Sequence, residues 1–279
     1  MTRMTAPRQL KTLKPPEMNG ATLLVALTGW MDGGDVSTGT VKQLMGKRQV
    51  KRIATISSDD FYIYNFPGSM EISAIFRPHV KYVDGIVEEF DMPINVFWAD
   101  KENNLVFFVG KEPNLKWQTY ADCIFSLAKQ VGVSRIIFIG SFGGSVPHTR
   151  EPRLFGSVSH EHLKQELTQY GVRLSDYEGP GSFATLLLHD AERHDVEMLS
   201  FVAEIPGYLE GMNPLSIEAI SKRLSRMLNQ PLDLATLRKT SHDWESRVTA
   251  AVEKDEELAE TIRKLEEAYD NDLISSDET

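Results

Sequence analysis

The residues best suited to chemistry lie in one glycine-rich segment, Gly140 to Pro152, which reads GSFGGSVPHTREP. Backbone N–H groups in such a segment can turn toward a ligand, because glycine has no Cβ atom to oppose a positive φ. His148 and Arg150 add side-chain donors that suit an anion. His148 also titrates near neutral pH, as a general acid or base should. We therefore predict a ligand-binding loop here, with a tight surface turn as the alternative.

Three further segments combine glycine with polar side chains next to predicted elements. GWMDGGD (29–35) follows an apolar run, and GPGSF (179–183) precedes a helix. AEIPGYLEGMNP (203–214) ends an apolar strand and carries Glu204, a candidate acid or base. The first segment matches no phosphate-loop pattern, so a structural turn and a ligand-facing loop both stay open. Ser182 is interpreted as a helix cap rather than a nucleophile.

The elements that position these segments alternate between strands and helices. Apolar runs predict strands at 22–28, 50–57, 94–99, 105–109, 135–140 and 196–205. Caps and periodicity predict helices at 36–45, 115–131, 160–170 (capped by Ser159), 182–193 and 216–228, while 58–82 reads as irregular. This alternation predicts an α/β fold with a mixed, mainly parallel sheet flanked by helices. Polar residues 100–104 predict a hairpin. The glycine-rich loops would then share one edge of the sheet, and we expect His148 and Arg150 to border a cleft with Trp30 and Glu204.

Composition excludes several classes of function. The net charge of −10 is concentrated in residues 251–279, which hold eleven acids and three bases. The rest of the chain shows no basic stripe, which argues against binding of nucleic acid. No apolar run is long enough to span a membrane, and the N-terminus lacks the apolar region of a secretory signal. The single cysteine, Cys123, makes cytoplasm the default location. No zinc-ligand spacing occurs, so we expect no metal and no cofactor.

The chain divides into three expected parts. These are a flexible N-terminal arm (1–20), an α/β domain (21–230) and an acidic helical C-terminal extension (231–279). The extension carries apolar residues at coiled-coil spacing on what reads as one long helix: Trp244, Val248, Ala251, Leu258, Ile262, Leu265 and Tyr269. The heptad position that is skipped is Asp255. This apolar seam would pack either on the body of the chain or on another subunit.

The order of the four loops resembles the proteasome assembly chaperone family of the second-subunit type, in its bacterial and archaeal branch. The resemblance covers roughly residues 22–228, and Gly-Trp-x-Asp with Pro-His-Thr-Arg carries it. It implies a fold similar to purine nucleoside phosphorylases and related hydrolases, oligomeric assembly, and no established reaction. Archaeal relatives that engage the proteasome end in hydrophobic–Tyr–any residue. Here the penultimate residue is Glu278, so docking through that tail is not expected.

Two hypotheses on function result. The first is a non-enzymatic assembly or chaperone-like protein that forms a homo-oligomer and holds a protein partner. The alternative is an enzyme or sensor for an anionic or nucleoside-like small molecule, with His148 and Glu204 as the catalytic candidates. The candidate ligand-binding residues are Gly29, Trp30, Asp32, Gly33, Gly143, Gly144, His148, Thr149, Arg150 and Glu204.

Overall fold

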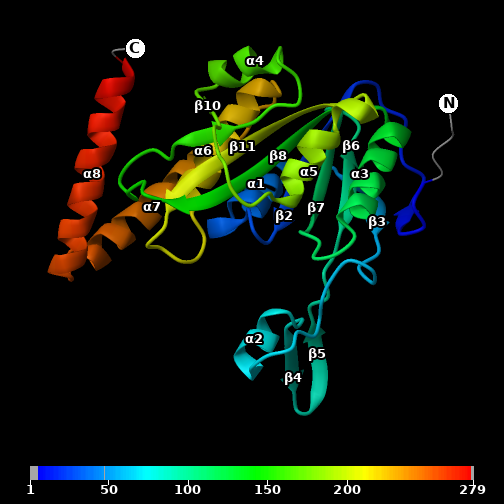
Figure 1. Ribbon diagram of the computed structural model, residues 1–279, viewed down its shortest axis with the longest axis horizontal. Coiled ribbons are helices and arrows are strands. Elements are labelled where there is room, and N and C mark those ends of the chain that lie inside the picture. Colours follow the sequence, from blue (N-terminus) through cyan, green and yellow to red (C-terminus); the bar gives the residue numbers. More distant parts are fainter. Residues whose placement is uncertain (1–5, 47, 278–279) are drawn as a thin grey trace.

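A computed structural model describes residues 6–46 and 48–277 (Figure 1). Within these residues, nine strands form one sheet in the order β1-β3-β6-β7-β2-β8-β11-β9-β10. Their bounds are β1 (Leu10–Thr12), β2 (Ala21–Thr28), β3 (Lys51–Ile56), β6 (Val96–Asp100), β7 (Leu105–Lys111), β8 (Val133–Gly144), β9 (Leu154–Gly156), β10 (Arg173–Leu174) and β11 (Glu197–Pro206). The central strands β7, β2, β8 and β11 run parallel, and antiparallel pairs flank them. The predicted mixed α/β sheet is thus confirmed.

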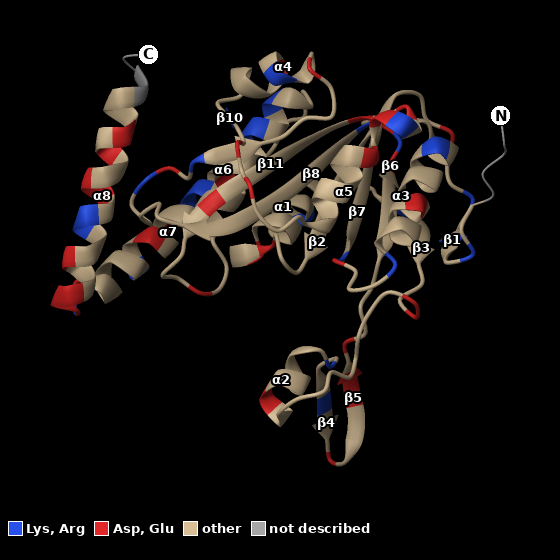
Figure 2. Ribbon diagram, viewed as in Figure 1, with Lys and Arg blue, Asp and Glu red and all other residues tan. Residues whose placement is uncertain are grey.

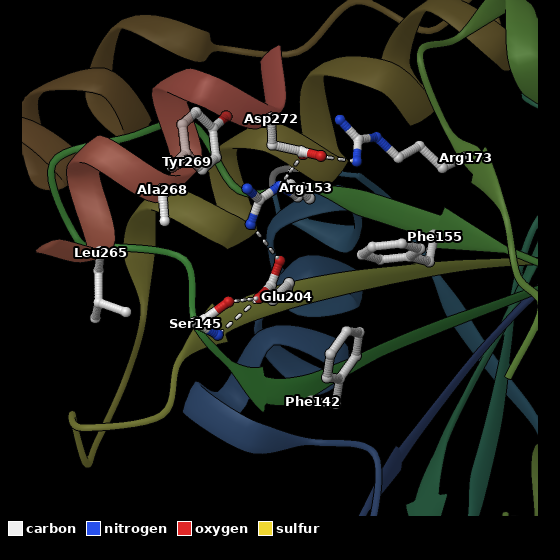
Figure 3. Close-up of a pocket in the computed structure, with 10 residues that line it drawn as sticks. All are labelled: Phe142, Ser145, Arg153, Phe155, Arg173, Glu204, Leu265, Ala268, Tyr269 and Asp272. Carbon is white, nitrogen blue, oxygen red and sulfur yellow. Dashed lines mark hydrogen bonds and ion pairs between the residues drawn. The ribbon is translucent and has the colours of Figure 1, made fainter. Parts of the chain in front are cut away.

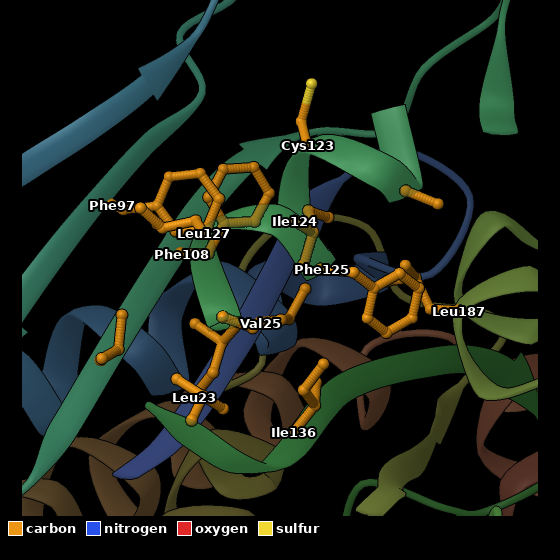
Figure 4. Packing of buried hydrophobic residues seen from close by; sticks show 14 of the residues in the cluster. Leu23, Val25, Phe97, Phe108, Cys123, Ile124, Phe125, Leu127, Ile136 and Leu187 are labelled. Carbon is orange, nitrogen blue, oxygen red and sulfur yellow. The ribbon is translucent and has the colours of Figure 1, made fainter. Parts of the chain in front are cut away.

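Helices cover both faces of this sheet. The helices on the sheet or beyond its end are α1 (Val36–Met45), α3 (Trp117–Val131), α4 (Leu163–Gln169), α5 (Phe183–Asp190), α6 (Pro214–Met227), α7 (Leu234–Val252) and α8 (Glu256–Asp277), with single 3-10 turns at Gly33–Asp35 and Glu192–His194. Helices α3 and α5 pack on one face, where Phe108, Ile124 and Leu187 are fully buried (Figure 4). Helices α1 and α6 pack on the other, through residues such as Val41 and Ile220. The alternation of apolar residues along each central strand supplies both cores.

Local signals placed most elements well. The run from Val36 to Met45 forms α1, and Gly132 ends α3 with a φ of +85°, which glycine adopts without steric cost. Ser182 caps α5, with its hydroxyl accepting from the Thr185 backbone N–H at 3.2 Å. Strands β6 and β7 form the predicted antiparallel pair.

Three predictions about elements were wrong. Ser159 does not cap α4, which begins at Leu163; its hydroxyl instead accepts from the Met198 N–H at 2.8 Å, tying the chain to β11. Strand β8 runs on to Gly144, through the first part of the glycine-rich segment. The C-terminal extension is two helices rather than one, because the Asp255 carboxylate accepts from the backbone N–H groups of Glu257 and Leu258 and so begins α8.

The chain between β3 and β6 forms a unit that the sequence did not predict. We call residues 65–94 the projecting module; it holds α2 (Met70–Ile75) and a hairpin of β4 (Val80–Val83) and β5 (Ile86–Phe90). Figure 1 shows it standing away from the sheet on two connecting segments. None of its residues is buried.

The ends of the chain complete the description. Leu10–Thr12, within the segment expected to be an arm, pair with β3 at the edge of the sheet. The prediction about the C-terminal tail concerns Glu278, which lies outside the described residues. Among the residues described, no helix combines the length and apolar character needed to cross a membrane.

Candidate functional site

The four glycine-rich loops meet at the carboxyl ends of the parallel strands. The Ser141 N–H donates to the Met31 carbonyl at 2.9 Å, which joins the end of β8 to the loop after β2. The Asn213 N–H donates to the Gly34 carbonyl at 2.8 Å, which brings in the loop after β11. The convergence expected from the topology is therefore present.

Glu112, at the end of β7, joins the remaining loop to this group. One carboxylate oxygen accepts from the Trp30 N–H at 3.0 Å, and the other accepts from the Phe183 N–H at 2.9 Å. A single side chain thus holds the loop after β2 beside the first turn of α5. Sequence reasoning missed this residue, although a carboxylate just beyond an apolar strand was a usable signal.

Glu204 on β11 is a buried clamp for the glycine-rich segment. Its Oε1 accepts from the backbone N–H groups of Ser145 and Val146, at 2.7 and 3.1 Å. Its Oε2 lies 3.2 Å from the Arg153 guanidinium, as Figure 3 shows. Only 6% of Glu204 is exposed. A buried carboxylate with this many charge-assisted partners holds backbone in place.

Of the glycines of β8, Gly144 is explained by this clamp rather than by backbone torsion. The expectation that they adopt positive φ was wrong, because neither Gly143 nor Gly144 does so. A Cβ atom at Gly144 would instead overlap the Glu204 side chain. Glycine is therefore needed where Glu204 crosses over the strand.

His148 is buried and bonded on both ring nitrogens. Its Nδ1 lies 2.7 Å from the Tyr208 hydroxyl, and its Nε2 lies 3.1 Å from the hydroxyl of Thr249 on α7. Because the Thr249 hydroxyl donates to the Glu245 carbonyl, it accepts from Nε2–H, and Tyr208 donates to Nδ1. Burial lowers the pKa of His148, while the Glu245 and Glu266 carboxylates oppose that shift. The neutral ring thus joins the loop to α7.

Thr149 and Arg150 bind α8. The Thr149 hydroxyl donates to Glu266, and the Arg150 guanidinium forms a bidentate pair with Asp270, with both distances 2.8 Å. The third guanidinium nitrogen lies 3.5 Å from Glu266. The hydrogen bonds from Arg150 hold the pKa of Asp270 below its usual value. An anion at Arg150 would have to displace this helix.

Asp32 lies at the start of α1. Its carboxylate accepts from the backbone N–H and the hydroxyl of Thr38, at 3.0 and 2.9 Å. Burial raises the pKa of Asp32 to about 6, although the bonds from Thr38 favour its charged form. Asp32 therefore acts as an anchor for the helix start. Gly29 and Gly33 belong to the same loop.

Two cavities lie near these loops. The first, of about 430 Å³, lies between the end of the sheet and α8 and is lined by Glu204, Arg153 and Tyr269 (Figure 3). The second, of about 580 Å³, is lined by Trp30 and residues of β11 and α5. His148 and Arg150 line neither of these two cavities, and Trp30 and Glu204 line different ones. Across the described part of the chain, no group of three His, Cys, Asp or Glu residues is placed to hold a metal ion.

Comparison with known proteins supplies an independent line of evidence. Residues 26–252 match the model of the PAC2 family. Among solved structures, a Mycobacterium tuberculosis protein of unknown function has a TM-score of 0.84 at 22% identity, covering 98% of this chain and 92% of that one. A proteasome-assembly chaperone homologue from the same organism has a TM-score of 0.73 at 25% identity, covering 86% and 99%.

A more distant solved structure is PbaB of Pyrococcus furiosus, described as an archaeal proteasome activator. Its TM-score is 0.64 at 16% identity, covering 88% of this chain and 99% of that one. At this identity the likeness shows the fold alone. No curated protein matches the sequence.

Proposed function

Because the chain belongs to the PAC2 family, we propose that it is a non-enzymatic assembly protein that works as a homo-oligomer and binds a protein partner. A similar solved protein is described as a proteasome-assembly chaperone homologue, which supports this class of function. The polar residues first considered for catalysis support it too. His148, Arg150 and Glu204 each bond to groups of the same chain.

The projecting module carries the proposal. It exposes large apolar side chains on a unit that adds nothing to the core: Met70 (84%), Ile75 (77%), Ile86 (73%), Tyr82 (62%) and Phe90 (58%). Apolar groups gathered in this way on a soluble protein indicate a surface that binds another protein. Four of the module's seven charged residues lie on the hairpin, and three of these, Lys81 with Glu88 and Glu89, pair with one another (Figure 2).

The exposed apolar side chains of the module need a partner surface to cover them. A two-stranded hairpin is marginally stable in water, since it has one pair of strands and no opposing layer. Both β4 and β5 are edge strands with unpaired backbone groups. The stack of Phe66 on Phe76, with ring centroids 5.0 Å apart, is the one ring contact found within the described residues of the module. Packing inside the module is therefore slight.

We assign the cover to a second copy of the chain. A two-fold contact lets each module bury the apolar side chains of the other, and every copy carries the same complementary surface. The oligomeric assembly implied by the family resemblance agrees with this choice. The paired modules would leave the body of each subunit free to hold a partner.

Light scattering on size-separated protein tests this proposal. The wild type should have a mass that is a multiple of the 31.5 kDa chain. The variant Ile86→Lys should have the mass of one chain. An isoleucine buried in the contact between two copies would contribute about 1.5–3 kcal/mol to the free energy of association, and a lysine ammonium in its place would remove this contribution.

A matched control separates this effect from a general loss of apolar surface. Leu13 is 56% exposed and lies outside the module, so Leu13→Lys should keep the wild-type mass. A wild-type mass of one chain would overturn self-association. An oligomer that survives Ile86→Lys unchanged would overturn the role of the module.

A further inference from the structure

The second cavity has the construction of a small-molecule site, and nothing in the proposed assembly role uses it. It lies on the sheet face that α5 covers, where the alternating residues Met198, Ser200 and Val202 of β11 form the floor. Trp30, in the loop after β2, and Phe142, near the end of β8, also line it. Its volume of about 580 Å³ falls within the range of about 300–1,000 Å³ that is typical of ligand pockets.

The walls of this cavity are aromatic and partly exposed. Trp30 is 66% exposed, and Tyr177 and Phe142 are also open to solvent. Phe142 and Phe155 pack at a tilt, with ring centroids 5.7 Å apart. Aromatic walls of this kind favour a flat ring in the space between them, through edge and face contacts.

The charges around the cavity decide the class of ligand. Among the described residues that line it, none is Lys, Arg or His, and Asp176 is the one carboxylate. The Glu112 carboxylate accepts from the backbone N–H of Trp30, which lines the cavity. An anion entering here would lose its hydration without gaining a cation, which is costly. Apart from Asp176, the polar side chains of the lining carry hydroxyls, such as those of Ser157 and Ser175.

We propose that this cavity binds an uncharged, largely apolar aromatic molecule. Such a ligand differs from the anionic ligand that the glycine-rich segment suggested. Glu112 is then a positioning residue, because it sets the separation of Trp30 from the start of α5. The site lies apart from the projecting module, so it stands independently of self-association.

Two fluorescent probes with the same ring system test the proposal on the full chain. N-phenyl-1-naphthylamine is uncharged, and 8-anilinonaphthalene-1-sulfonate adds one sulfonate. The uncharged probe should bind saturably with one site per chain, and the sulfonate probe should bind at least about tenfold more weakly. Val202→Phe fills the cavity and should reduce the affinity for the uncharged probe by about tenfold or more.

Three further variants make the result specific. Trp30→Ala removes an exposed wall of the cavity and should reduce the affinity for the uncharged probe. Leu115 is 45% exposed and does not line the cavity, so Leu115→Ala should leave that affinity unchanged. Leu174→Lys places a cation at the cavity and should narrow the difference between the probes. Equal binding of both probes, no saturable binding, or wild-type binding by Val202→Phe with an unchanged melting temperature would each overturn the proposal.

Discussion

At the scale of residues, the chemically conspicuous groups hold the fold together. His148 joins its loop to Tyr208 and α7, Arg150 holds α8, and Glu204 holds the backbone at Ser145. Sequence reasoning could select these residues, because a His, an Arg and a Glu beside glycines are unusual. It could not find their partners, since Thr249 and Asp270 lie about a hundred residues away and meet them only once α7 and α8 have docked.

Asp32 gives a prediction about pH at this scale. Burial raises its pKa to about 6, so the folded protein binds this proton more tightly than the unfolded chain. The contribution of Asp32 to stability is therefore present below about pH 4 and is lost as the pH rises through about 6. Asp32→Asn should remove this pH dependence of the free energy of unfolding and should stabilise the protein by about 1–2 kcal/mol at pH 7.5. Urea unfolding between pH 4 and pH 8 measures this free energy. If the variant showed the same pH dependence as the wild type, the raised pKa of Asp32 would be contradicted.

At the scale of elements, local signals succeeded wherever the local sequence decides the structure. Apolar runs located the buried strands, and Gly132 and Ser182 marked helix ends. The break between α7 and α8 was visible in Asp255, the skipped heptad position, but the apolar seam outweighed it. The hairpin of β4 and β5 was missed because it has no buried face, so its apolar residues follow no clean alternation.

The docking of α8 gives a prediction at the same scale. Arg150 and Arg153 on the body pair with Asp270 and Asp272 on α8, and Figure 2 shows acidic residues along this helix. Arg150→Ala should make the backbone amides of α8 exchange about two- to fivefold faster, because partly exposed pairs contribute modestly. Hydrogen exchange with mass spectrometry measures this rate.

The control for this prediction is a pair that lies within α8. Arg263 contacts Glu260 of the same helix, so Arg263→Ala should leave the docking intact. Equal exchange in Arg150→Ala and Arg263→Ala would contradict the docking role. Arginine contacts also lower the pKa of Asp270 and of Asp272, so their contribution to docking should be lost as the pH falls below about 4.

At the scale of the whole molecule, the chain has two parts that differ in how well they are packed. The sheet and its helices form a body in which the loops are bonded to one another and closed by α7 and α8. The projecting module lacks buried residues and displays its apolar side chains to solvent. Composition and charge indicated a protein without a nucleic-acid surface, but only the folded chain reveals the exposed apolar side chains on which the proposed interaction surface rests.

The central claim is that the projecting module joins copies of the chain while the body folds without it. Replacing residues 67–92 with a short Gly-Ser linker tests both halves, because every core residue lies outside that range. Light scattering should give the mass of a single shortened chain, and thermal unfolding should show a cooperative transition for the body. An assembly of the same number of copies as the wild type would contradict the claim.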